Sequence, residues 1–312
     1  MKPHILQMGA YPAWDQAPLD AAFTVHRHDL APDKAAFLAA IGPGVRAIAT
    51  SGGIGASAAL MDACPALELI SIYGVGYDAV DMPAARARGI AVTNTPDVLT
   101  DDVADLAIGM LLAALRGIPA ADAWARSGSW ASKGAFALQR KVTGLRIGIL
   151  GMGRIGMAIA ERLIPFKADI AYSATTAKSV PWPFIPDPVA LAQRSDVLIL
   201  ALSASPATRH IVNADVIAAL GPEGMLLNIS RAANVDEDAL LTALETRALG
   251  CAALDVFEAE PAFNPRFATL PNVLLQPHHA SATTATRRAM GQLMRDNLTA
   301  HFAGKPLLTP VG

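Results

Sequence analysis

Four polar residues in the second half of this 312-residue chain combine side-chain types that could carry acid–base chemistry: Arg231, Asp255, Glu260 and His278. Each comes soon after a short apolar run, and such runs predict buried strands. Because the carboxyl ends of parallel strands meet at one edge of a sheet, we expect these side chains to converge there. Taken singly, an arginine after a strand is usually a surface ion-pair partner, and a histidine before a helix is usually a cap. Their shared placement is what favours a site.

Hydride transfer to a 2-oxo acid requires this set of side chains. A cation must hold the substrate carboxylate and polarise the ketone, and the planar fork of Arg231 can do so with two hydrogen bonds. A general acid must protonate the forming alkoxide, which suits a histidine such as His278. A carboxylate beside that histidine, here Glu260, would fix its tautomer. Asp255 is placed to bind the nicotinamide carboxamide and orient the ring.

A glycine-rich turn, Gly151-Met152-Gly153-Arg154-Ile155-Gly156, lies between a short apolar run and a helical pattern. The order of strand, turn and helix predicts a dinucleotide-binding turn. Gly151 permits the tight turn, Gly153 lets the backbone approach a pyrophosphate, and Gly156 lets helix and strand pack closely. The amino end of the helix offers N–H groups to the phosphates. The alternative is an ordinary turn in a chain with 24 glycines.

The strand after this turn, Ile170–Tyr172, predicts which dinucleotide binds. An NAD-selective site usually places an acidic residue at the end of this strand, where it binds the ribose. This chain has hydroxyls and a cation there instead, at Ser173, Thr175, Thr176 and Lys178. An aspartate would repel a 2′-phosphate, whereas these side chains could bind one. We therefore expect NADP(H) to be preferred and NAD(H) to be possible, unless the loop does not contact the ribose.

The first hundred residues also alternate apolar runs with helical patterns, which predicts a parallel sheet covered on both faces. The predicted strands are Ile5–Met8, Ala47–Thr50, Leu69–Tyr73 and Ile90–Thr93. Two of them end in glycine turns, Ser51-Gly52-Gly53 and Gly74-Val75-Gly76, whose backbone N–H groups could hold a carboxylate. Ordinary strand-to-helix turns are the alternative.

A domain crossing is expected near Thr95-Pro96-Asp97, before a long apolar helix from Val103 that Asp101 or Asp102 would cap. The last helix, from about Ala282 to Phe302, is long enough to return to the first domain. The prediction is an α/β chain with two doubly wound parallel sheets. Residues 1–97 and 283–312 form a substrate-binding domain, and residues 98–282 form a dinucleotide-binding domain inserted in it.

Composition narrows the functional class. The chain is 53% hydrophobic and 17% charged, so it can bury a large core. A net charge of −2 without a basic run argues against nucleic acid and anionic membranes as partners. Cys64 and Cys251 lack metal-like spacing and lie in apolar runs, which predicts buried free thiols and no metal site. No signal peptide or run of about 18 apolar residues is present, so we expect a soluble cytoplasmic protein.

The chain resembles the D-isomer-specific 2-hydroxyacid dehydrogenase family over essentially its whole length. Five stretches carry the resemblance: Gly74–Asp81, the glycine turn, Asn228–Arg231, Ala253–Pro261 and Pro277–Ser281. It implies Arg231 as substrate anchor, Glu260 as partner and His278 as acid/base. The family's glutamate directly precedes a proline, which selects Glu260 over Glu258. The family's histidine directly follows a proline, which selects His278 over His279.

The resemblance implies further contacts as well. Backbone N–H groups of Val75 and Gly76 would bind the substrate carboxylate. Cofactor contacts are implied at Arg154, Ile155, Thr208 and Ile229. It implies a Rossmann dinucleotide-binding domain, a flavodoxin-like substrate domain and a homodimer through the nucleotide domains. One departure concerns the cofactor, since NADPH-using relatives usually carry an arginine near Thr175 and this chain does not.

Within the family the chain is most similar to glyoxylate/hydroxypyruvate reductases, including the hydroxyphenylpyruvate-reducing branch, which Trp130–Phe136 resembles. The leading hypothesis is reduction of a small 2-oxo acid to the D-2-hydroxy acid with NAD(P)H. One alternative is oxidation of a D-2-hydroxy acid in vivo. Another is a dinucleotide-sensing binding protein or corepressor on the same fold. The joint presence of Arg231, Glu260 and His278 disfavours the sensor, which needs no proton donor.

Overall fold

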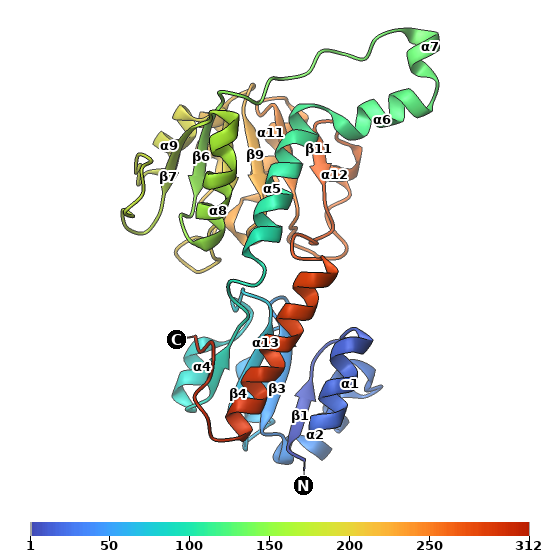
Figure 1. Ribbon diagram of the computed structural model, residues 1–312, viewed down its shortest axis with the longest axis vertical. Coiled ribbons are helices and arrows are strands. Elements are labelled where there is room, and N and C mark those ends of the chain that lie inside the picture. Colours follow the sequence, from blue (N-terminus) through green and yellow to red (C-terminus); the bar gives the residue numbers. More distant parts are fainter. Residues whose placement is uncertain (1, 312) are drawn as a thin grey trace. The chain divides into compact units, whose positions relative to one another are not determined.

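The computed structural model describes residues 2–311, which divide into two compact units (Figure 1). The first unit comprises Met1–Leu99 and Ser281–Gly312, and the second comprises Thr100–Ala280. The predicted domain boundaries lie two residues from these. Each unit is an open parallel sheet with helices on both faces, which confirms the predicted fold class.

The first unit contains five parallel strands in the order β2-β1-β3-β4-β5, the flavodoxin-like arrangement. The strands are β1 His4–Gln7, β2 Thr24–Arg27, β3 Ala47–Ser51, β4 Leu69–Tyr73 and β5 Ala91–Thr93. The helices are α1 Ala13–Ala22, α2 Lys34–Ile41, α3 Ala58–Asp62, α4 Met82–Ala87 and α13 Thr284–Phe302. The sequence did not predict α1 or β2. Pro18 interrupts the helical pattern of α1, and β2 is a half-buried edge strand with a polar sequence.

Both faces of this sheet are covered. On one face, α2, α3 and α4 enclose an apolar core that includes Ile48, Leu60 and Ile70. On the other, α13 lies along β4 beside α1 (Figure 1), and the Ser71 hydroxyl donates to the Met294 carbonyl at 3.2 Å. The carboxyl-terminal helix is therefore an integral part of the first unit.

A buried ion pair fixes α1 against α13. Asp15 is fully buried and pairs with Arg295. The Tyr73 hydroxyl, at the end of β4, donates to the Arg287 carbonyl at 2.6 Å and contacts Asp15 at 3.3 Å. Burial raises the pKa of Tyr73 to about 12, so this hydroxyl keeps its proton at neutral pH. The cluster holds the end of β4 and the Gly74–Gly76 turn that follows it.

The second unit contains six parallel strands in the order β11-β10-β9-β8-β6-β7. They are β6 Arg146–Leu150, β7 Asp169–Ser173, β8 Val197–Leu200, β9 Met225–Asn228, β10 Cys251–Leu254 and β11 Val273–Leu275. A parallel bridge between Tyr172 and Phe184 adds a rudimentary strand outside β7. Counting that strand third along the chain gives the order 3-2-1-4-5-6-7, which is the 3-2-1-4-5-6 order of a dinucleotide-binding fold with β11 as a seventh strand, and the glycine turn directly follows the first strand.

Helices cover both faces of this sheet as well. They are α5 Thr100–Leu115, α6 Ile118–Arg126, α7 Ser129–Lys133, α8 Arg154–Leu163, α9 Pro188–Arg194, α10 Ala214–Leu220, α11 Glu237–Glu245 and α12 Arg266–Thr269. One face packs on α5 and α8, and the other packs on α9 to α12. Figure 1 shows α6 and α7 extending away from the rest of the unit. Among residues 2–311 no single helix is long and apolar enough to cross a membrane, although α5 and α6, bent by 57°, pass that test jointly.

One expectation about this unit was wrong. Asp101 and Asp102 lie within the first turn of α5, which begins at Thr100, so neither of them caps the helix. Their negative charges still interact favourably with the amino end of the helix dipole. After residue 127 the chain forms the short helix α7. Within this chain Trp130 is 70% exposed.

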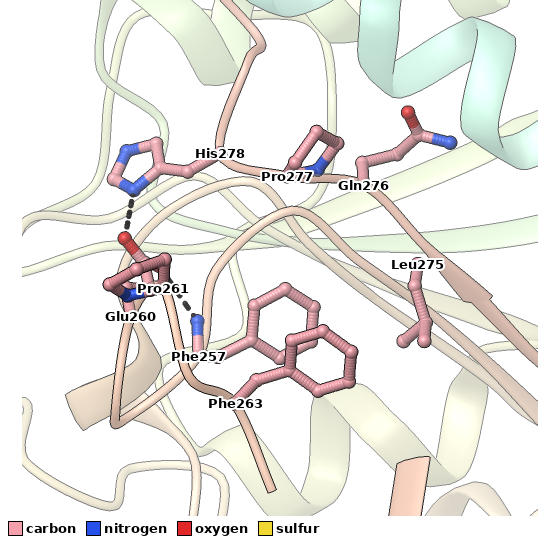
Figure 2. A pocket seen from close by; sticks show the side chains of 8 residues that line it. All are labelled: Phe257, Glu260, Pro261, Phe263, Leu275, Gln276, Pro277 and His278. Atoms are coloured by element: carbon pink, nitrogen blue, oxygen red, sulfur yellow. Dashed lines mark hydrogen bonds and ion pairs between the residues drawn. The ribbon is translucent and has the colours of Figure 1, made fainter. Parts of the chain in front are cut away.

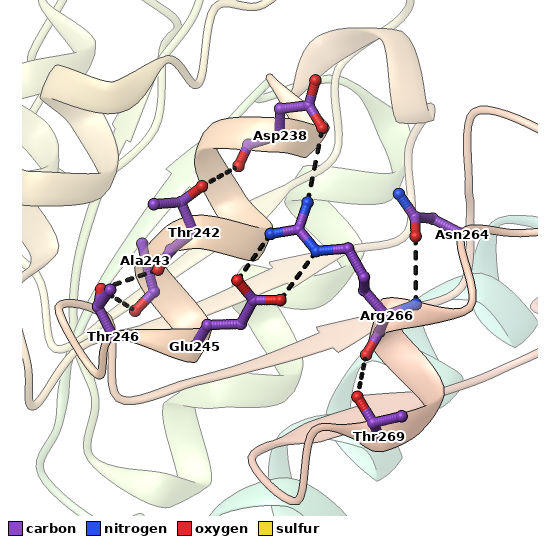
Figure 3. Close-up of polar contacts among 8 residues, drawn as sticks. All are labelled: Asp238, Thr242, Ala243, Glu245, Thr246, Asn264, Arg266 and Thr269. Carbon is purple, nitrogen blue, oxygen red and sulfur yellow. Dashed lines mark hydrogen bonds and ion pairs between the residues drawn. The ribbon is translucent and has the colours of Figure 1, made fainter.

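The loop between β10 and β11 is anchored at its far end by an ion-pair network (Figure 3). Arg266 of α12 donates two hydrogen bonds to Glu245 of α11, at 2.7 and 2.8 Å, and lies 3.9 Å from Asp238. Its backbone N–H donates to Asn264 at 3.1 Å. These contacts tie α12 to α11 and limit the freedom of the segment that carries Glu260.

The glycine turn provides a stability test with an internal control. A Cβ at Gly156 would overlap the Gly151 carbonyl, whereas a Cβ at Gly153 would meet nothing within 4 Å. Gly156→Ala should therefore lower the free energy of unfolding by about 2–3 kcal/mol through overpacking. Gly153→Ala should leave it within about 0.5 kcal/mol. Urea titration followed by circular dichroism measures both, and equal losses would contradict the packing argument.

Candidate active site

The carboxyl ends of β9, β10 and β11 bring three of the predicted site residues to one edge of the second sheet. Asn228, Leu254 and Leu275 are aligned across these strands. Arg231 follows Asn228 by three positions, Asp255 directly follows Leu254, and His278 follows Leu275 by three. The expected convergence is therefore confirmed for these residues, because parallel pairing leaves no other edge for them.

His278 and Glu260 form a short polar contact at this edge (Figure 2). The Nδ1 atom of His278 lies 2.6 Å from Oε2 of Glu260. The other carboxylate oxygen, Oε1, accepts a hydrogen bond from the Phe257 backbone N–H at 2.9 Å. A carboxylate can only accept, so Nδ1 carries the proton. Nε2 has no partner among residues 2–311 and is left for an incoming group.

Asp255 holds the segment that carries this histidine. The residue is 1% exposed, and its two carboxylate oxygens accept hydrogen bonds from the backbone N–H groups of His279 and Ala280, at 2.9 and 3.1 Å. Burial raises the pKa of Asp255. His278 itself has a φ of +50°, an uncommon conformation for a residue with a side chain. The sequence analysis did not foresee this bracing.

A buried polar network shapes the turn that presents Arg231. The Asn228 amide oxygen accepts from both the backbone N–H and the hydroxyl of Ser230, at 2.9 and 2.7 Å. The Asn228 amide N–H donates to the Arg231 carbonyl at 3.1 Å. Asn234, fully buried, donates to the Ser230 hydroxyl at 3.1 Å. Arg231 donates to the Ser230 carbonyl at 2.8 Å and remains half-buried.

The amino end of α8 has the features of a phosphate site. Gly153 is its N-cap residue and has no side chain that could cap the first-turn N–H groups, the groups to which a phosphate binds at a helix amino end. In contrast, α9, α10 and α11 are capped by Asp187, Asn213 and Asp236. The open space at Gly153 allows close approach of a pyrophosphate. The residues present therefore fit the predicted dinucleotide.

The loop after β7 carries the residues predicted to select the cofactor. The Ser173 side chain is buried and donates to the Pro186 carbonyl at 3.1 Å. Thr175 and Lys178 are exposed. The Lys178 backbone N–H donates to the buried Tyr172 hydroxyl at 2.7 Å, which fixes the loop and leaves the lysine side chain outside. A 2′-phosphate would therefore meet Thr175 and Lys178 rather than Ser173.

Two other predicted cofactor residues have structural surroundings of their own. The Thr208 hydroxyl accepts from the Ser205 backbone N–H at 2.8 Å and lies 3.0 Å from the Ser203 carbonyl oxygen. It therefore shapes the turn in which it lies. Ile229 is 7% exposed, next to Asn228. Their cofactor roles stay predictions.

In the first unit, the turn after β4 offers backbone donors. The N–H groups of Val75 and Gly76 have no acceptor within the part of the chain that the structure describes. Gly74, with φ of +151°, accepts from the Thr95 N–H at 2.9 Å, and Asn94 donates to the Val75 carbonyl at 2.8 Å. The carbonyls of Gly74 and Val75 are thus satisfied while two donors stay open, as an anion site requires.

An apolar cavity of about 250 Å³ lies beside the His278–Glu260 pair (Figure 2). Its walls are Phe257, Pro261, Phe263, Leu275, Gln276 and Pro277, together with the pair itself.

The thiols are not part of this edge. Burial raises the pKa of Cys64 and of Cys251 to about 11, so both stay protonated at neutral pH. Within residues 2–311, no group of three histidine, cysteine or acidic side chains is arranged to hold a metal.

Comparison with known proteins identifies the family. Residues 108–280 match the model of the D-isomer specific 2-hydroxyacid dehydrogenase NAD binding domain, and the similarity below extends over the whole chain. The chain belongs to the D-isomer specific 2-hydroxyacid dehydrogenase family. It is 46% identical to hydroxyphenylpyruvate reductase from Plectranthus scutellarioides over 98% of both chains. The resemblance inferred from the five motifs is thereby confirmed.

Solved structures of other family members have the same fold as this chain. A 2-hydroxyacid dehydrogenase from Ketogulonicigenium vulgare is 65% identical, with a TM-score of 0.94 over 100% of this chain and 99% of that one. An NADPH-dependent glyoxylate/hydroxypyruvate reductase from Sinorhizobium meliloti, in complex with NADP and malonate, is 43% identical, with a TM-score of 0.93 over 100% and 97% of the two chains.

The supporting residues of this dehydrogenase site were not predicted. Asn228 and Ser230 belong to a quoted motif, but the sequence analysis gave them no role. Polar side chains at the end of an otherwise buried run were the available signal, because a buried polar group needs a partner. The hydrogen bond from the Phe257 N–H could not be predicted from the sequence, because every residue except proline carries the same backbone N–H group.

The Asn228 network can be tested through stability. Asn228→Ala would break three buried hydrogen bonds, so it should lower the free energy of unfolding by about 2–3 kcal/mol. Asn213→Ala, which removes the exposed cap of α10, should cost about 1 kcal/mol. Chemical denaturation of both variants compares the same residue type in the same unit. If both variants lose the same free energy of unfolding, the buried network stabilises the protein no more than a helix cap does.

Proposed function

We propose that this chain is a reductase of small 2-oxo acids that prefers NADPH and produces D-2-hydroxy acids. The observation that carries the proposal is the 2.6 Å contact between His278 Nδ1 and Glu260, with Nε2 left unpartnered among the described residues. This arrangement gives a proton donor of fixed orientation. A sensor or corepressor on the same fold needs no such donor.

Bound nicotinamide supplies the hydride. The chain's own residues have the other tasks. The Arg231 guanidinium binds the substrate carboxylate and polarises the ketone. His278 delivers the proton from Nε2 to the oxygen as it becomes an alkoxide, and the negative charge of Glu260 stabilises the imidazolium beforehand. The reverse sequence, in which neutral His278 accepts a proton, would serve oxidation of a D-2-hydroxy acid.

The substrate class is supported from two directions. Relatives act on hydroxyphenylpyruvate or on glyoxylate and hydroxypyruvate by their names. The open N–H groups of Val75 and Gly76 in the first unit suit a carboxylate, the group that these acids share. The proposal is therefore a compact 2-oxo acid, with glyoxylate and hydroxypyruvate as the first candidates.

The cofactor preference rests on the loop after β7. It presents Thr175 and Lys178 where an acidic residue would select NAD, and the structure of the Sinorhizobium meliloti relative contains NADP. Arg154 and Ile155, at the start of α8, are the proposed pyrophosphate contacts. NAD(H) remains a possible second cofactor, because the loop carries no arginine.

A homodimer and a cytoplasmic location complete the proposal. The α6–α7 segment and the loop after it expose large apolar side chains, with Ile118 52%, Trp130 70% and Leu138 100% exposed. Such residues on an extended segment suit contact with a second copy. Two free thiols without a disulfide suit a reducing compartment.

Turnover provides the decisive test. The protein should oxidise NADPH with glyoxylate or hydroxypyruvate, and His278→Ala should lower kcat by roughly 10²–10⁴-fold through loss of the general acid. His279→Ala, which alters the neighbouring ring, should retain kcat within about tenfold. No NAD(P)H oxidation across a panel of 2-oxo acids would refute the reductase.

Cofactor choice is a separate prediction. Lys178→Ala should raise KM for NADPH by roughly tenfold, the equivalent of about 1.4 kcal/mol, and leave KM for NADH unchanged. Lys141→Ala, an exposed lysine of the same unit, is the control and should change neither. Steady-state rates with both cofactors measure the effect. A preference of the unaltered protein for NADH would reverse the assignment of the loop.

A further inference from the structure

We propose that Asp255 is a positioning residue, which holds the His278 ring in line for proton transfer by anchoring the backbone of the two residues after it. The inference rests on the proposed role of His278 as acid. It assigns Asp255 a task within the protein itself, in addition to the nicotinamide contact predicted from the sequence.

The geometry of the carboxylate supports this assignment. Asp255 Oδ1 accepts from the His279 N–H at 2.9 Å, and Oδ2 accepts from the Ala280 N–H at 3.1 Å. The backbone of Asp255 is in turn fixed to the sheet, because its N–H donates to the Asn228 carbonyl at 3.0 Å. The two loop residues are thus tied to the central part of the sheet through one side chain.

His278 needs support on both sides because its backbone is strained. A non-glycine residue with positive φ persists only where its surroundings determine it. On the amino side, the Gln276 N–H donates to the Leu254 carbonyl at 2.8 Å and ends the pairing of β11 with β10. On the carboxyl side, Asp255 supplies the two backbone contacts. Without them, the conformation that directs the ring towards Glu260 would relax.

The burial of Asp255 strengthens the argument. Removal from water disfavours the ionised carboxylate, as the direction of its pKa shift shows. Hydrogen bonds to an ionised acceptor are stronger than those to a neutral one. A neutral asparagine of the same shape would avoid the desolvation, but its NH2 group would face an N–H group of the loop. Because both oxygens accept from N–H groups, the site is matched to a carboxylate that carries no proton.

The test uses the full-length protein without cofactor, so that it does not depend on turnover. In ¹⁵N-histidine NMR spectra, the Nδ1 proton of His278 is assigned by its loss in His278→Ala. Asp255→Asn should shift or broaden this resonance. Asp187→Asn is the matched control, because Asp187 also accepts from two backbone N–H groups, at 2.6 and 3.1 Å, at the start of α9. It should leave the His278 signal in place.

Kinetics then separate the two roles of Asp255. A positioning role predicts that Asp255→Asn lowers kcat by roughly 10–100-fold while the Kd for NADPH stays within about threefold. Partial recovery of kcat in Asp255→Glu would support the need for charge. An unchanged His278 resonance together with weaker NADPH binding would overturn the inference. A normal resonance change without any reductase activity would count against the proposed function alone.

Hydrogen exchange in the unaltered protein covers the case in which Asp255→Asn does not fold. The amide protons of His279 and Ala280 should exchange as slowly as those of the paired residues in β10. Exchange at the rate of an unprotected loop would show that the carboxylate does not hold them, and would overturn the inference without any variant.

Discussion

The in-register pairing of β9, β10 and β11 is the interaction on which the site depends. Of the aligned residues, Asn228 and Leu254 are buried and Leu275 is partly buried, and Arg231, Asp255 and His278 lie one to three residues beyond them. A slip of one position would turn every side chain of a strand to the other face. The positions of Arg231 and His278 are therefore fixed by the packing of apolar strand residues that take no part in the reaction.

Support around the reacting groups then comes from hydrogen bonds with the backbone rather than from more catalytic side chains. Asn228 holds the turn before Arg231, Asp255 holds the segment after His278, and the Phe257 N–H holds one oxygen of Glu260. In each case a backbone group takes part. Such contacts fix geometry with few rotatable bonds, which is what an oriented proton donor requires.

The fold was largely predictable because its strands are buried and apolar. Leu69–Tyr73 was predicted with its observed bounds, and the strand predicted to begin at Ala47 does begin there. Prediction failed where tertiary contacts override the local pattern. The ion pair between Asp15 and Arg295 spans almost the whole chain, so no local window could reveal why α1 tolerates Pro18. The predicted end of the first strand, Met8, lies one residue beyond the observed end of β1, whereas Ala47–Thr50 and Ile170–Tyr172 end one residue short of β3 and β7.

The site was predictable to the level of residue type and order, because the motifs name Arg231, Glu260 and His278. The hydrogen bonds that support these residues were not predictable. Nothing in the sequence shows that the oxygens of Asp255 face two loop N–H groups, or that the Ser173 hydroxyl turns towards Pro186. Those contacts depend on how segments distant along the chain return to the sheet edge.

The Tyr172 hydroxyl bonds to Lys178 only through that residue's backbone, accepting from its N–H at 2.7 Å and lying 3.2 Å from its carbonyl oxygen. This contact does not depend on the side chains at the exposed positions of the loop, Thr175 and Lys178 among them. Under the proposed role of the loop in cofactor binding, substitutions there would change the preferred dinucleotide without disturbing the sheet. The tyrosine would thus make cofactor choice adjustable separately from the reaction chemistry.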